Sequence, residues 1–251
     1  MPTVHFHGEV LPRTAIISVS KMPGVAWKIK ERGLSLHFQV EIERSQIHLT
    51  VNANTYSPDD IAVLYKHALD IARTVVELAA FKKGYGVFVL LSRFVDPDGV
   101  SKELVLGCNE NLARICTAFD LTDGFPQMWR IVQLSPAIFA ILNDLIASIT
   151  VPHVATVNCA RAIDGIRQLI GGSGTDKQQW SAMRQTLRVD REYLQFITDR
   201  SKGPRHGNRL YLDGVAVTEI VERSWTIMNR FLEYKKSGDK PLPASFPELH
   251  G

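Results

Sequence analysis

Residues 34–43 read LSLHFQVEIE, and this stretch decides the fold class of the first half of the chain. Apolar side chains occupy every second position, and polar side chains occupy the positions between them. Successive side chains of a strand point to opposite faces of its sheet, so this alternation predicts a strand with one buried and one wet face. Residues 46–52, QIHLTVN, follow after a break at Arg44 and Ser45. The two stretches predict neighbouring strands of an antiparallel sheet.

A long helix is predicted directly after these strands. Ser57 is suited to cap it, Pro58 to occupy its first position, and Asp60 to place a carboxylate at the positive end of the helix dipole. Apolar residues then keep helical spacing until two lysines and Gly84, which are typical of a last turn and a stop.

Further strands are predicted on both sides of this pair and its helix. Residues 14–20 and 25–29 are rich in β-branched and apolar side chains. Residues 86–95 and 102–108 flank a turn and predict a hairpin that extends the sheet. Residues 1–108 are therefore expected to form strands packed against one long helix.

Strand signals end at residue 109, and the rest of the chain has helical spacing. We place a domain boundary near residue 150, where Pro152 marks a fresh start. The predicted organisation is an α+β unit at 1–150, a helical bundle at 151–236 and an extended tail at 237–251. The predicted fold class is α+β, an N-terminal antiparallel sheet with a long helix followed by an all-α four-helix bundle.

Composition indicates a globular protein without membrane contact. Of its 251 residues 45% are hydrophobic and 22% charged, no apolar run is long enough for a membrane span, and the N-terminus lacks a signal-peptide layout. We therefore expect a cytoplasmic protein. Cys108, Cys116 and Cys159 lack CxxC spacing, so neither a disulfide framework nor a metal site is indicated.

The net charge of +3 is unevenly distributed along the chain. Residues 151–251 hold 15 Lys and Arg against 11 Asp and Glu, while residues 1–150 hold 14 against 15. The C-terminal part is therefore the better candidate to bind a polyanion.

The stretch DREYLQFITDRSKGPRHGN at 190–208 is the main candidate for a functional site. It predicts a helix whose last turn is basic and which breaks at Gly203 and Pro204, because proline lacks an N–H and clashes with the preceding turn. The basic residues and the histidine at this helix end are Arg200, Lys202, Arg205, His206 and Arg209.

This arrangement resembles the HEPN superfamily of small helical domains. Its signature is an arginine followed by a polar residue, with a histidine four to six residues further on; here Arg200 and Ser201 precede His206, with five intervening residues. Asp164 inside the first helix of the bundle and a long last helix with aromatic residues are similar as well. The resemblance covers residues 152–236 only.

The resemblance implies an endoribonuclease that needs no metal ion and no cofactor. His206 would act as general acid and base, and Arg200 would stabilise the phosphate, with Arg205 as the alternative because of the expected break before it. A homodimer through the helical domain and a role in bacterial defence are also implied. The residues expected to contact the RNA are Lys202, Arg209, Ser201 and Asn208.

Other interpretations of these residues stay open. The basic residues are also favourable as plain cations at a helix C-terminus, and a non-catalytic protein that dimerises and binds RNA, nucleotide or a protein partner fits the same sequence. Trp180, Trp225 and Phe231 stand at helical positions and are interpreted as core residues before stacking platforms for bases. His5 and His7 share a strand face, but no third ligand follows at useful spacing, so a structural role is favoured.

Overall fold

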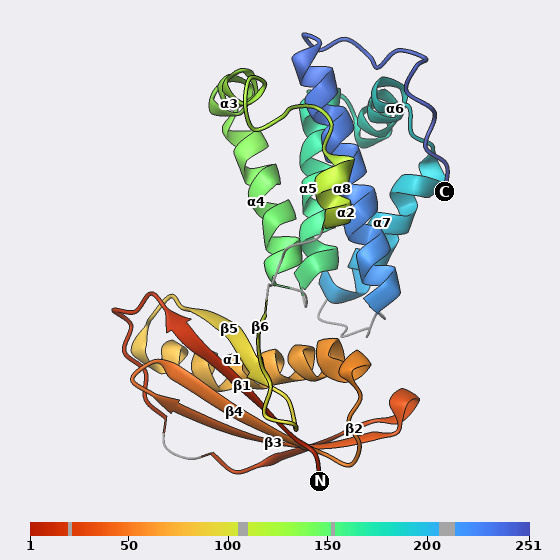
Figure 1. Cartoon of the computed structure of the whole chain (residues 1–251). Helices are drawn as coiled ribbons and strands as arrows, with labels where there is room; N and C mark the ends of the chain where they lie inside the picture. Colours follow the sequence, from red (N-terminus) through yellow and green to blue (C-terminus); the bar gives the residue numbers. More distant parts are fainter. Residues whose placement is uncertain (20–21, 105–109, 152–153, 206–213) are drawn as a thin grey trace. The chain divides into compact units, whose positions relative to one another are not determined.

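The structure is a computed structural model with two compact units, Met1–Leu106 and Gly107–Gly251 (Figure 1). The first unit is an antiparallel sheet with a long helix, and the second unit is helical. The predicted α+β fold class is thereby confirmed. The structure describes every residue except 20–21, 105–109, 152–153 and 206–213.

The described strands of the first unit form one six-stranded sheet in which all neighbours are antiparallel. The β3–β4 pair runs from Leu36 opposite Ala53 to Glu43 opposite Gln46, as the alternating sequence predicts. Arg44 and Ser45 between them have positive φ angles of 48° and 68°. In sheet order the strands are β2 (Val25–Ile29), β3 (Leu34–Glu43), β4 (Gln46–Ala53), β1 (Thr3–Leu11), β5 (Phe88–Val95) and β6 (Ser101–Glu103).

Helix α1 (Ile61–Lys83) covers the apolar face of this sheet. It follows a short 3₁₀ turn, η2 (Pro58–Asp60), where the Ser57 hydroxyl accepts from the Asp59 N–H at 3.3 Å and the Asp60 carboxylate accepts from the Ser57 N–H at 3.1 Å. The helix ends at Gly84, whose φ of 67° is the left-handed conformation that glycine adopts without steric cost. Both predicted ends of the helix are confirmed.

The stretch 14–20 was predicted to be a strand, and for the residues that the structure describes this is wrong. Val19 makes one isolated bridge to Ile42, and Ile17 is fully buried with its N–H donating to the Ser45 hydroxyl at 2.9 Å. β1 lies earlier, at 3–11, and pairs with both β4 and β5. Ala15 and Ile17 of this stretch are buried, while its backbone bonds the β3–β4 turn instead of a full partner strand.

The second unit is built around α5, which packs against α4, α6, α7 and α8. Its side chains Cys159, Ile163 and Ile166 are fully buried in a core that all the described helices of this unit share. These helices are α2 (Glu110–Ile115), α3 (Phe125–Gln133), α4 (Pro136–Thr150), α5 (Ala155–Gly171), α6 (Asp176–Leu187), α7 (Arg191–Arg205) and α8 (Gly214–Lys236).

The boundary predicted near residue 150 is corrected to the position between Leu106 and Gly107. Helix α4 buries Ile138, Ile141 and Leu145 in the same core as α5, so it belongs to the helical unit. Gly165 permits the close α4–α5 approach, because a Cβ there would lie 2.7 Å from a carbon of Ile141. The helical unit is therefore larger than the expected four-helix bundle.

The tail at 237–251 lacks helix and strand, as predicted, but it is part of the helical unit. Leu242 is buried, and Leu249 forms a bridge with Val189 just before α7. Arg230 of α8, itself only 5% exposed, donates to the Pro247 carbonyl at 2.6 Å. The tail therefore contributes to the packing around the start of α7.

Candidate functional site

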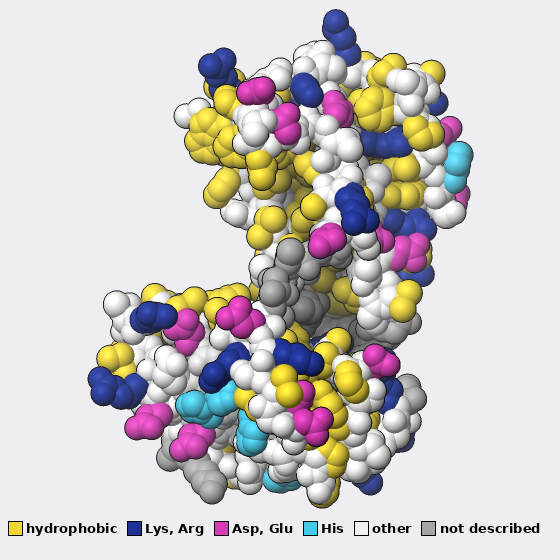
Figure 2. Space-filling model, in the orientation of Figure 1, with side chains coloured by type: hydrophobic (Ala, Val, Ile, Leu, Met, Phe, Trp, Pro, Cys, Tyr) yellow, Lys and Arg dark blue, Asp and Glu magenta, His cyan; other side chains and the backbone are white. Residues whose placement is uncertain are grey.

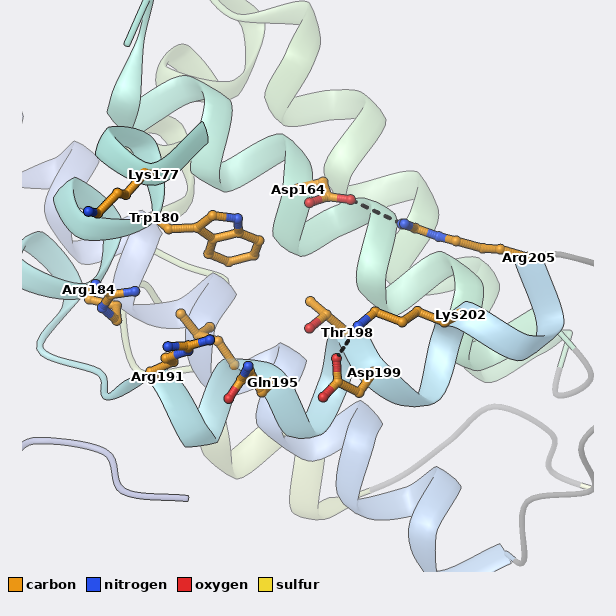
Figure 3. A pocket seen from close by; sticks show the side chains of 11 residues that line it. Asp164, Lys177, Trp180, Arg184, Arg191, Gln195, Thr198, Asp199, Lys202 and Arg205 are labelled. Carbon is orange, nitrogen blue, oxygen red and sulfur yellow. Dashed lines mark hydrogen bonds and ion pairs between the residues drawn. The ribbon is translucent and has the colours of Figure 1, made fainter. Parts of the chain in front are cut away.

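The main candidate site is a cavity of about 580 Å³ in the helical unit, lined by α5, α6 and α7 (Figure 3). Among its lining side chains five are cationic and two are acidic, a net charge of +3. An apolar part is contributed by Trp180 and Leu194. The charged side chains are Asp164, Lys177, Arg184, Arg191, Asp199, Lys202 and Arg205.

Helix α6 brings two cations and a tryptophan to one wall of the cavity. Thr175 caps this helix, with its hydroxyl accepting from the Gln178 N–H and the Gln178 side chain accepting from the Thr175 N–H. Lys177, Trp180 and Arg184 follow at spacings of three and four, which places them on one side of the helix.

Helix α7 forms the facing wall. Asp190 caps it, because its carboxylate accepts from the Tyr193 N–H at 2.7 Å. Hydrogen bonds from the Tyr193 and Gly251 N–H groups and from His250 lower the pKa of Asp190, against a burial effect that raises it. Five cavity residues of α7 recur at spacings of three or four, with Leu194 and Asp199 next to them: Arg191, Gln195, Thr198, Lys202 and Arg205.

Two of the five cations at the cavity are neutralised by acids. Arg205 Nη2 lies 3.0 Å from Asp164 Oδ2, and Lys202 Nζ lies 2.7 Å from Asp199 Oδ1 (Figure 3). Arg167 of α5 lies 3.6 Å from the same Asp164, too long for a hydrogen bond but close enough for an ion pair. Of these pairs, Arg205 with Asp164 joins α7 to α5, whereas the other two each lie within one helix.

The other three cations have no ion-pair partner among the residues that the structure describes. They are Lys177, Arg184 and Arg191, from α6 and from the first turn of α7. A cation without a neutralising acid attracts anions, and an arginine binds a phosphate through two parallel hydrogen bonds. The cavity is therefore suited to an anion with more than one charge.

The predicted site residues are divided by the structure. Lys202 and Arg205 line the cavity, but Arg200 does not: its guanidinium carbon lies 3.5 Å from the centre of the Phe196 ring, and it donates to the Phe196 carbonyl at 3.2 Å. Ser201 is fully buried and its hydroxyl donates to the Thr198 carbonyl, so it is not positioned to contact RNA. The predicted residues His206, Asn208 and Arg209 lie outside the described residues.

The predicted helix break at Gly203 and Pro204 is wrong, because α7 continues to Arg205 with Pro204 inside it. Pro204 removes one backbone N–H, and with it the bond to the carbonyl of Arg200, but the neighbouring residues keep the helical conformation. Arg205 is therefore still helical. It reaches Asp164 from the same face of α7 that carries Lys202.

Most of the cavity residues were not predicted as site residues, among them Trp180 and the three cations Lys177, Arg184 and Arg191. The helical spacing within KQQWSAMR at 177–184 was visible in the sequence, but nothing in it connects that face to α7. Trp180 packs against the core of the unit, as interpreted, and it also lines the cavity.

A second cavity, of about 550 Å³, lies on the polar face of the sheet, where Figure 2 shows histidines gathered beside Lys and Arg side chains. His7 Nδ1 lies 3.0 Å from His48 Nδ1, so one ring donates and the other accepts. His5 instead contacts Thr50 at 3.2 Å. Within the described part of the chain, no group of three or more His, Cys, Asp or Glu side chains is arranged to hold a metal ion.

The His7–His48 pair predicts acid sensitivity of the sheet unit. Burial, followed by the charges of Arg93, His48 and His5, lowers the pKa of His7 below its ordinary value of 6.5. The unfolded chain therefore binds this proton more readily, so the stabilising contribution is present above pH 6.5 and is lost as the pH falls through the lower folded-state pKa. We expect the thermal midpoint to fall from neutral pH to about pH 5, and to fall less in His7→Gln.

Thermal melts of both proteins across this pH range check the prediction. Burial also lowers the pKa of His67, so part of the acid sensitivity remains in the variant. If the wild type and His7→Gln lose equal stability as the pH falls, His7 is not a source of the acid sensitivity.

Among the described residues, no single helix is long and apolar enough to cross a membrane. By length and composition alone, α3 and α4 would pass such a test together, but they are bent by 111° at the break between them.

The fold and the cavity define a two-unit α+β protein whose helical unit carries a cationic site. Residues 4–105 match the family model described as domain of unknown function (DUF8168) N-terminal domain, and residues 125–236 match that of the DUF8168 C-terminal domain. The chain is thus similar to the DUF8168 family over both of its units, and the second match includes every helix of the cavity. The comparisons with curated proteins and with solved structures gave no match.

Proposed function

We propose that the helical unit binds RNA in the cationic cavity between α5, α6 and α7. The observation that carries this proposal is that Lys177, Arg184 and Arg191 line one cavity with no ion-pair partner among the described residues. Their charge suits the phosphates of a polyanion. The resemblance of residues 152–236 to HEPN domains makes RNA the preferred polyanion.

We further propose that the bound RNA is cleaved without a metal ion, with Arg205 and His206 as the catalytic pair. Arg205 takes the role first expected of Arg200, because Arg205 lines the cavity while Arg200 packs on Phe196. His206 follows Arg205 directly in the sequence and lies outside the described residues, so its role rests on its residue type and on the resemblance.

The chemistry of such a pair is internal attack by the ribose. A neutral imidazole takes the proton of a 2′-hydroxyl, the 2′-oxygen bonds to the adjacent phosphorus, and the bond from phosphorus to the 5′-oxygen breaks. A protonated imidazole gives a proton to the leaving 5′-oxygen, and Arg205 stabilises the negative charge on the phosphate oxygens. A homodimer, as the resemblance implies, would supply the second imidazole.

The test is an assay of the wild-type protein and His206→Ala with RNA and with DNA of the same sequence, in the presence of EDTA. We expect the wild type to cleave only RNA, and His206→Ala to be slower by about 10²- to 10⁴-fold, as for the loss of a general acid or base. The matched control is His5→Ala in the sheet unit, which should keep full activity.

The outcomes separate the two candidate functions. RNA binding by both proteins with cleavage by neither would overturn the catalytic proposal and favour a non-catalytic RNA-binding protein. Absence of RNA binding by the wild type at low salt would overturn both the catalytic proposal and the proposed RNA binding. A cytoplasmic location, a homodimer and a role in bacterial defence stay predictions from the sequence.

A further inference from the structure

We infer that the cavity takes one unpaired RNA nucleotide whose base stacks on Trp180, so that the protein selects single-stranded over duplex RNA. This inference rests on the proposed RNA binding and adds Trp180 as the residue that contacts the base. The tryptophan is a cavity-lining residue of α6, and Figure 3 shows its indole extending from α6 into the space between the labelled side chains.

Trp180 is in contact with the side chain of Arg167. The guanidinium carbon of Arg167 lies 5.0 Å from the centre of the indole, within the range of a cation–π contact. Arg167 is itself buried, with Nη1 2.7 Å from Asp176 Oδ1 and a second acid, Asp164, at 3.6 Å. The ring is therefore ordered before a ligand arrives, which reduces the entropy lost on binding.

The cations lie on both sides of the ring along α6. Lys177 is three residues before Trp180 and Arg184 is four residues after it, roughly 10 Å apart along the helix axis. Arg191 adds a third charge from α7. A base that stacks on Trp180 would thus have a cation available for the phosphate on each side of its ribose.

Unpaired RNA fits this arrangement and duplex RNA does not. A cavity of about 580 Å³ is in the range of sites for small molecules, so it has room for a single nucleotide. In a duplex both faces of each base are covered by neighbouring pairs, and sequence readers of RNA accordingly use unstacked bases in loops and single strands. Aromatic stacking tolerates any base, because every base has a π face.

The test measures the affinity of the protein for two RNAs. One is single-stranded oligoadenylate, and the other is the duplex of oligoadenylate and oligouridylate. Both carry 2′-O-methyl groups so that no cleavage can occur. We expect the wild type to prefer the single strand. Trp180→Leu should weaken single-strand binding by about five- to 150-fold, the range for one lost base stack, and should leave duplex binding unchanged. Trp180→Phe keeps an aromatic ring and should retain most of the preference.

Trp129→Leu is the matched control, since Trp129 is 54% exposed on α3 and lies outside the cavity. Far-UV circular dichroism melts establish that Trp180→Leu folds, and quenching of tryptophan fluorescence by the single strand, lost in Trp180→Phe, reports the contact directly. If Trp180→Leu is folded and binds the single strand as tightly as the wild type, the stacking inference is wrong while RNA binding stands. If the wild type binds neither RNA, the proposed function itself fails.

Discussion

Replacing Lys177, Arg184 and Arg191 together by glutamine is expected to weaken binding of single-stranded RNA by about 100-fold or more. Each charge-assisted contact to phosphate contributes on the order of 1 kcal/mol or more, and each 1.4 kcal/mol is a factor of about ten in affinity. These three cations are not neutralised by any described acid, so their charge is fully available to the ligand. Fluorescence anisotropy with a 2′-O-methyl oligoadenylate measures the loss.

The salt dependence gives a second readout of the same variant. Loss of three phosphate contacts should make the slope of log affinity against log salt concentration shallower by about 2 for a single strand. The matched control removes three exposed arginines of the same unit that do not line the cavity, Arg114, Arg130 and Arg161. If the control variant loses as much affinity as the cavity variant, binding reflects the overall charge of the unit and the cavity is not the site.

Arg230→Ala is expected to destabilise the helical unit by on the order of 3 kcal/mol. Arg230 Nη1 donates to the carbonyls of Leu187 at 2.8 Å and of Arg188 at 2.7 Å, and Nη2 donates to Pro247 at 2.6 Å. Burial lowers the pKa of this guanidinium. The free energy of unfolding still falls substantially in Arg230→Ala, because three carbonyl groups lose their hydrogen-bond donor and the tail loses an attachment to α8.

Urea denaturation of Arg230→Ala checks this prediction, with Arg161→Ala as the control variant. Arg161 pairs with Asp144 at 3.3 Å, but its side chain is 62% exposed, so its removal should change the free energy of unfolding by less than about 1 kcal/mol. An Arg230→Ala protein as stable as the Arg161→Ala protein would mean that water replaces the lost donors without cost.

The sheet unit shows which parts of the fold local sequence patterns predict and which they do not. Period-two alternation at 34–43 predicted β3 with its bounds, and Ser57 with Gly84 predicted where the helical segment over the sheet starts and ends. These signals depend on residues close in sequence, through side-chain alternation and capping. The stretch 14–20 has the same composition as a strand, yet β1 occupies the place between β4 and β5, and pairing between distant segments cannot be read from composition.

The candidate site, too, is determined partly by local sequence and partly by tertiary packing. The sequence by itself determined the basic last turn of α7, and with it Lys202 and Arg205. Only the tertiary structure decided which arginine faces the cavity, because the choice depends on Asp164, 41 residues away on α5, and on Phe196, which holds Arg200 on another side of α7. Only the packing of α6 beside α5 and α7 places Trp180 in the same cavity as three cations that have no ion-pair partner among the described residues, since contacts between helices depend on side chains far apart in sequence.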